Sequence, residues 1–179
     1  MGVKVIYIAG VPASGKSTLF KELRDKFFAT PSEFKEGKCR GLQSENYRML
    51  GVFDGSLFEG TDKLSMTVID DAIAYINRLR NAPEKYVVFV EGDRLFNQRF
   101  IVETRALLLL IDANEAVLKQ RHLQRGDTQT DTFLRSRRTK VENFITKHHC
   151  MRIWNNTPAD RERILAFIIK TAREYVATV

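Results

Sequence analysis

The chain has 179 residues, of which 44% are hydrophobic, so it is long enough for one domain with its own core. Only two cysteines are present, which argues against a disulfide-stapled secreted scaffold and favours reduced thiols in the cytoplasm. The net charge of +7 favours anionic partners, and no apolar run is long enough to cross a membrane, so no membrane partner is expected.

The N-terminal segment carries a phosphate-binding pattern. An apolar run over 3–9 predicts a buried strand, and the sequence GVPASGKST follows it at 10–18. The two glycines let the backbone curl, so that its N–H groups and the start of the next helix point at phosphate oxygens. Lys16 supplies a full charge for the phosphates, and the Ser17 hydroxyl is a ligand for Mg²⁺. We therefore expect ATP and Mg²⁺ to bind here, with nucleotide contacts from Gly10, Ala13, Ser14, Gly15, Lys16, Ser17 and Thr18.

The segment after this motif predicts two helices with short strands between them. A helix is expected from residue 16 to about 28, followed by a loop over 32–37. Short strands are expected at 39–43 and 47–52. The Gly-rich polar segment 53–63 is expected to be a long functional loop, and apolar residues at helical spacing predict a helix over 69–79.

An acidic strand end occupies the middle of the chain. The apolar run 86–90 is typical of a strand buried on both faces, and the sequence EGDR follows it at 91–94. Because the carboxyl ends of parallel strands line the ligand crevice of an open sheet, we expect these side chains beside the phosphate-binding loop. Asp93, just past the strand end, is the expected general base that takes the proton of an acceptor hydroxyl. Glu91 is an alternative base or holds Mg²⁺, and Asp62 is the third candidate for the base.

The second half of the chain is strongly basic. The run 106–111 predicts another buried strand, and Asp112 is expected to cap the next helix with Glu115 as its capping-box partner. That helix has Arg121 and Arg125 on one face, and a second basic helix is expected after it. This stretch is interpreted as a phosphate clamp or a nucleic-acid surface, with a solvated basic face as the alternative. Its nine basic residues, against three acidic ones, are Lys119, Arg121, Arg125, Arg135, Arg137, Arg138, Lys140, Lys147 and Arg152.

The last part of the chain predicts one more strand, over 150–154, and a helix that begins near Thr157 with Pro158 in its first turn. Strands alternate with helices along the chain. This alternation predicts an α/β fold, a five-stranded parallel sheet with helices on both faces, in a single domain over 1–179.

The phosphate loop, the acidic strand end and the basic helices together resemble the P-loop kinases related to nucleoside monophosphate kinases. The resemblance covers nearly the whole chain. It implies that residues about 38–80 bind the acceptor and that the Arg-rich segment about 121–147 is a lid over ATP. It also implies catalytic roles for Lys16, Asp93, Arg121 and Arg125, and a metal site at Ser17 and Glu91.

A narrower resemblance concerns the acceptor. The sequence GTDKLSM at 60–66, together with EGDR at 91–94, is similar to bacteriophage-encoded P-loop kinases, some of which phosphorylate 5-hydroxymethyluracil within DNA. It implies a DNA acceptor, on which aromatic side chains stack unless they pack in the core. A free nucleotide kinase, a polynucleotide 5′-hydroxyl kinase and a non-catalytic nucleotide-binding module are the alternatives. The expected acceptor contacts are Tyr47, Phe53, Asp62, Lys63, Arg94, Arg137 and Arg138, and Phe58 is a further stacking candidate.

Overall fold

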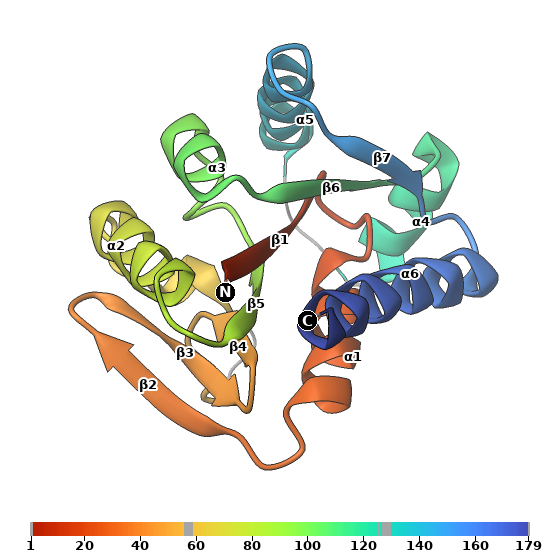
Figure 1. Ribbon diagram of the computed structural model, residues 1–179. Helices are drawn as coiled ribbons and strands as arrows, with labels where there is room; N and C mark the ends of the chain where they lie inside the picture. The colour runs from red at the N-terminus through yellow and green to blue at the C-terminus, as the bar shows by residue number, and fades with distance from the viewer. Residues whose placement is uncertain (1, 56–58, 125, 127–129, 179) are drawn as a thin grey trace.

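The computed structural model describes residues 2–55, 59–124, 126 and 130–178, and a seven-stranded sheet forms its centre (Figure 1). The strand order is β2-β3-β4-β5-β1-β6-β7. Five neighbouring strands are parallel: β4 (Tyr47–Leu50), β5 (Lys85–Glu91), β1 (Gly2–Gly10), β6 (Leu107–Asp112) and β7 (Met151–Trp154). The predicted α/β class is confirmed, whereas the predicted number of five strands is wrong.

The two additional strands extend one edge of the sheet. β2 (Ser32–Glu36) pairs with β3 (Cys39–Ser44), and β3 pairs with β4, both in antiparallel fashion. The segment of β2 was expected to be a loop because four of its five residues are polar. At a sheet edge this composition is tolerated, since mainly Phe34 turns inward, where its ring stacks on Tyr75 at 4.6 Å.

Helices cover both faces of the sheet. Ile6 and Ile8 of β1 pack with α1 (Lys16–Phe27) and α6 (Pro158–Ala177). Val5 and Tyr7, which point the other way, pack with α2 (Ile69–Arg80) and α3 (Gln98–Thr104). Figure 1 shows the two layers on opposite sides of β1. No helix in the described part of the chain is long and apolar enough to span a membrane.

The start of the basic region differs from its prediction. Helix α4 (Glu115–Gln124) begins three residues after Asp112, which is instead the last residue of β6. The Asp112 carboxylate accepts the N–H of Ala113 at 2.8 Å and lies 3.7 Å from Arg152, so it does not cap the helix. The helix start predicted near Thr157 is present, and reciprocal bonds between Thr157 and Asp160 form a capping box at the start of α6.

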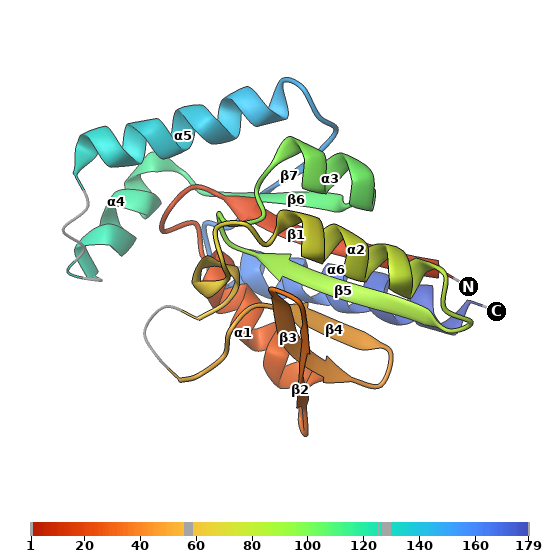
Figure 2. The same ribbon diagram turned by 90° about the vertical axis from the view of Figure 1, so that its left-hand side faces the viewer.

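The parallel strands end at one side of the molecule. In the register of β1 and β5, Ile8 pairs with Glu91, so the acidic strand end lies beside the segment that leads into α1. Figure 2 shows α4 and α5 (Asp131–Ile145) at this same end of the sheet. The short 3₁₀ helix η1 (Thr61–Lys63) also reaches it, because Thr61 donates a hydrogen bond to the carbonyl of Glu91.

Candidate active site

The phosphate-binding loop connects β1 to α1 in a tight conformation. Gly15, the residue before α1, has φ +96°, and a Cβ there would lie 2.4 Å from Nδ2 of Asn155. Glycine is therefore required at this position for both its backbone conformation and its lack of a side chain. Within the loop, the Lys16 ammonium donates to the carbonyl of Val11 at 2.9 Å.

Several donors in this loop fit phosphate oxygens. The N–H groups of Ser17 and Thr18 lie in the first turn of α1, where the helix itself offers no acceptor. The Ser14 hydroxyl is buried, and it lacks a hydrogen-bond partner among the residues that the structure describes. Such groups are costly unless a ligand satisfies them. The loop therefore fits the nucleotide phosphates that the sequence pattern indicates.

Glu91 lies beside the phosphate-binding loop, in one pocket with Lys16 and Ser17. Its carboxyl group lies near the Ser17 hydroxyl, which lowers its pKa, and only 7% of the residue is exposed. Burial is the main cause that raises its pKa from 4.5 to about 7; Lys16 opposes this rise, while Asp62 and Asp93 add to it. Mg²⁺ is commonly held by one or two carboxylates together with substrate phosphates, and the Ser17–Glu91 pair fits that donor set.

A pocket of about 260 Å³ joins the loop, the strand end and helix α5. Asp93 and Arg137 both line it, and their carboxylate and guanidinium form an ion pair at 2.7 Å. The structure thus brings together charged groups from three separate parts of the sequence. The described lining includes Lys16, Ser17, Asp62, Glu91, Asp93, Phe133, Arg137 and Lys140.

A second pocket, of about 220 Å³, lies on the other side of the loop and is lined by Thr18, Arg121 and Asn155. The Arg121 guanidinium donates to the carbonyls of Ala13 and Ser14, each at 3.3 Å. Asn155 donates to the Ser14 carbonyl at 2.8 Å and is 2% exposed. Asn155 is not among the predicted site residues, although it directly follows the last predicted strand and the strand-end rule that identified Glu91 applies equally there.

Other predicted site residues lie elsewhere in the structure. Lys63 forms an ion pair with Asp54 at 2.6 Å. Arg94 donates to the carbonyl of Asp62 at 2.8 Å. Arg138 lines a different pocket, of about 470 Å³, between α4 and α5. Arg125 lies outside the described residues.

The aromatic side chains expected to stack on a base are not among the described residues that line the pocket beside Asp93. Tyr47 contacts Phe27, with ring centroids 4.4 Å apart, and Phe53 stacks on Phe20 at 6.1 Å. Both belong to the packing of α1 against the sheet, and Phe58 lies outside the described residues. The aromatic ring in the pocket is Phe133, 5.0 Å from the Arg137 guanidinium. The sequence analysis missed it because nothing local distinguishes it from a core residue.

A solved kinase structure shares this fold, and two further solved structures resemble the chain less closely. A gluconokinase from Sinorhizobium meliloti 1021 has a TM-score of 0.51 at 14% identity, over 96% of this chain and 94% of its own. A sugar kinase from Janibacter sp. HTCC2649 has a TM-score of 0.48 at 13% identity, over 99% of both chains. Chaetomium thermophilum Kti12 in complex with ADP-AlF3 has a TM-score of 0.44 at 14% identity, over 97% of this chain and 100% of its own.

No curated protein sequence matches the chain significantly. A family model does match, over residues 1–154, and its description is P-loop Nucleotide Kinase3. The matched residues contain the phosphate-binding loop, the acidic strand end and both basic helices. The chain therefore belongs to the P-loop Nucleotide Kinase3 family.

Proposed function

We propose that the protein is a kinase that transfers the γ-phosphoryl group of ATP to a hydroxyl group of an anionic acceptor. The observation that supports this most strongly is the single pocket lined by Lys16, Ser17, Glu91, Asp93 and Arg137. Phosphoryl transfer needs cations around the transferred group and a base for the acceptor, and the pocket offers both. Family membership supports ATP-dependent phosphotransfer in general.

The transfer step assigns one task to each group. The acceptor oxygen forms a bond to the γ phosphorus, the bond from this phosphorus to the β–γ bridging oxygen breaks, and ADP leaves. The hydroxyl proton passes to the Asp93 carboxylate. Lys16 and Arg137 stabilise the charge that spreads over the phosphoryl oxygens. Ser17 and Glu91 would hold Mg²⁺, which would supply positive charge beside the nucleotide phosphates.

We assign a lid role to α4 and α5. Arg121 already contacts the phosphate-binding loop, and Arg137 reaches the catalytic pocket from α5. In a closed lid, Arg121 and Arg137 would face the phosphates of ATP, and Arg125, predicted to act with them, lies outside the described residues. Such closure excludes water from the reacting groups, which suppresses hydrolysis of ATP.

For the acceptor we propose a hydroxymethyl pyrimidine in DNA, with 5-hydroxymethyluracil as the first candidate. Support comes from the net charge of +7 and from the cations Arg137 and Lys140 beside the catalytic carboxylates. Phe133 offers a ring face on which an extruded base can stack. A free nucleotide and a polynucleotide 5′-hydroxyl present similar chemistry and are the alternatives.

The test is phosphotransfer from γ-labelled ATP to a panel of acceptors. The panel holds nucleosides, nucleotides, 5′-hydroxyl oligonucleotides, DNA with 5-hydroxymethyluracil, and gluconate. We expect label on the modified DNA and loss of turnover by orders of magnitude in Lys16→Ala. Nucleotide binding without transfer to any acceptor would instead identify a non-catalytic nucleotide-binding module.

A further inference from the structure

Three successive carbonyl groups of the turn that carries Asp93 accept hydrogen bonds. The carbonyl of Glu91 accepts from the Thr61 hydroxyl, and the carbonyl of Gly92 accepts from the Tyr7 hydroxyl at 2.6 Å. The carbonyl of Asp93 accepts from the N–H of Phe96 at 3.2 Å. The turn is therefore more constrained than an ordinary surface loop.

The side chain of Asp62 accepts hydrogen bonds from two backbone N–H groups of this turn. Its Oδ1 accepts from the backbone N–H of Asp93 at 2.8 Å and from that of Arg94 at 3.1 Å. The bonding is reciprocal, because the Arg94 guanidinium donates to the Asp62 carbonyl at 2.8 Å. One carboxylate oxygen therefore holds two successive amides of the catalytic turn.

The close approach of the two segments depends on Gly92. Its φ is +111°, and a Cβ there would lie 2.4 Å from the Thr61 hydroxyl and 3.0 Å from Oδ1 of Asp62. The absence of a side chain at this position lets Asp62 reach the amides beyond it. Two loops that are about 30 residues apart in sequence thus form one unit.

We propose that Asp62 is a positioning residue that holds Asp93 in the catalytic pocket. This inference rests on the proposed kinase function, in which Asp93 is the base. The sequence analysis left Asp62 as a candidate for that base. Because Oδ1 of Asp62 accepts two backbone N–H groups, its role is to fix the geometry of the turn, and the carbonyl oxygen of an asparagine side chain can accept the same two bonds.

The test compares Asp62→Asn with Asp62→Ala. Asparagine keeps an oxygen at the position of Oδ1, whereas alanine removes it. We expect kcat to fall at least tenfold in the alanine variant and to stay within about threefold of the unchanged protein in the asparagine variant, with the KM for ATP unchanged in both. If Asp62 were the base, the asparagine variant would lose about 100-fold or more, and this result would overturn the inference.

A second measurement does not depend on catalysis. Amide hydrogen exchange of Asp93 and Arg94 should become at least about tenfold faster in Asp62→Ala and should be nearly unchanged in Asp62→Asn. Asp70→Ala is the matched control, since Asp70 is an exposed carboxylate on α2 that pairs with Arg99 at 2.6 Å. Unchanged exchange in Asp62→Ala overturns the inference even if the proposed acceptor is wrong. If exchange becomes faster in Asp62→Ala but the unchanged protein transfers phosphate to no acceptor, the contacts of Asp62 are supported and only the proposed kinase function is rejected.

Discussion

Glu91, which we propose holds Mg²⁺, is a buried side chain that lowers the stability of the folded protein when its carboxyl group is ionised. Its carboxylate is 7% exposed, and burial raises its pKa from 4.5 to about 7. A carboxyl group whose pKa is raised by folding favours the folded state when it is protonated. This contribution is fully present below pH 4.5 and is lost as the pH rises through 7. The nucleotide-free protein at pH 8 therefore carries a buried negative charge near Lys16.

Glu91→Gln should remove the loss of stability that the ionised Glu91 causes, because the amide stays neutral at every pH. We expect the variant, free of nucleotide and Mg²⁺, to be more stable than the unchanged protein by about 3 kcal/mol at pH 8. The difference should shrink as the pH is lowered to 5. Urea unfolding at the two pH values measures it. An equal effect at both values would mean that the charge of Glu91 is not the cause. Phosphotransfer should meanwhile be lost.

Asp93 is the second carboxylate of this site, and its partner in the structure is the Arg137 guanidinium at 2.7 Å. Asp93→Asn removes the proton acceptor but keeps the shape of the side chain. We expect kcat to fall about 10²- to 10⁴-fold, with the affinity for ATP unchanged. Steady-state kinetics and a nucleotide titration measure the two quantities. An active Asp93→Asn together with an inactive Asp62→Asn would contradict the assignment of both residues.

At the scale of elements, α5 offers a matched pair of neighbouring arginines. Arg137 lines the catalytic pocket, whereas Arg138 lines the pocket between α4 and α5. Consecutive residues of a helix point about 100° apart, so one face of α5 is turned to the active site. We expect Arg137→Ala to lower kcat at least tenfold and Arg138→Ala to change it less than about threefold. Steady-state kinetics of the two variants compares them directly, and equal effects would exclude a specific role for this face.

Elements with strong periodicity or clear end signals could be predicted from the sequence. Helices α1 and α2 and the strands β5 and β6 lie within two residues of their expected bounds, because each combines a regular apolar pattern with a terminating signal. β2 and the seven-residue helix α3 were missed. The polar sequence of β2 is stabilised only by its pairing with β3, and α3 is too short to show a helical period.

The residues of the candidate site also fall into those that a local sequence pattern predicts and those that it does not. The phosphate-binding loop and Glu91 could be located because a local motif or a strand end specifies them. Phe133 meets the site only through tertiary packing, which no local pattern encodes. Arg137 was in the predicted set, and Asn155 directly follows a predicted strand, so the strand-end rule could have located it. The role of Asp62 likewise depends on a contact between segments about 30 residues apart. For Tyr47 the sequence leaves stacking on a base and packing in the core both open, and in the structure its ring packs on Phe27.

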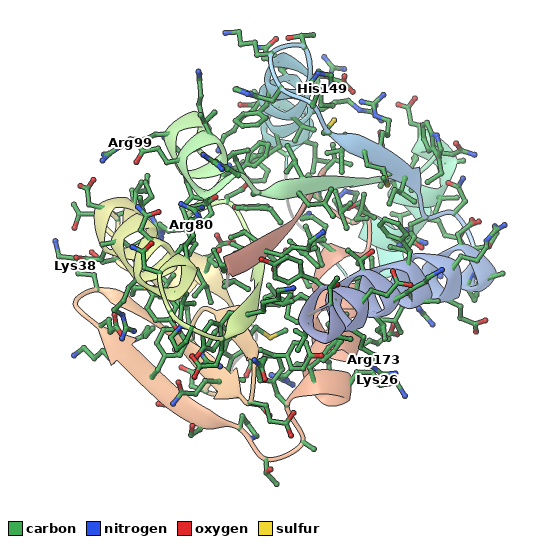
Figure 3. All side chains as sticks on the ribbon, in the orientation of Figure 1. Lys26, Lys38, Arg80, Arg99, His149 and Arg173 are labelled. Atoms are coloured by element: carbon green, nitrogen blue, oxygen red, sulfur yellow. The ribbon has the colours of Figure 1, made fainter. Side chains whose placement is uncertain are left out.

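At the scale of the whole molecule, positive charge is spread over many elements. Figure 3 labels Lys26, Lys38 and Arg173 at the periphery, on α1, on the turn between β2 and β3, and on α6. Part of the charge is paired, as in the ion pairs of Arg99 with Asp70 at 2.6 Å and Glu103 at 2.8 Å. The segment 119–152 nevertheless has nine lysines and arginines against three acidic residues, and it contributes Arg137 and Lys140 to the catalytic pocket. A polyanion that enters this pocket would therefore meet the basic helices as well.

This charge makes the proposed DNA acceptor testable through salt. Binding of a nucleic acid releases counterions, so its affinity falls with the logarithm of the salt concentration in proportion to the number of phosphates contacted. With about three or four contacts to a single strand, the KM for DNA should rise roughly 20- to 50-fold between 50 and 200 mM salt. The KM for a free nucleotide, which has far fewer phosphates to contact, should rise much less. After nuclease digestion the label should be on the modified base. Label on a 5′ end would identify a polynucleotide kinase instead, and salt-insensitive labelling of a small neutral molecule would reject a nucleic-acid acceptor.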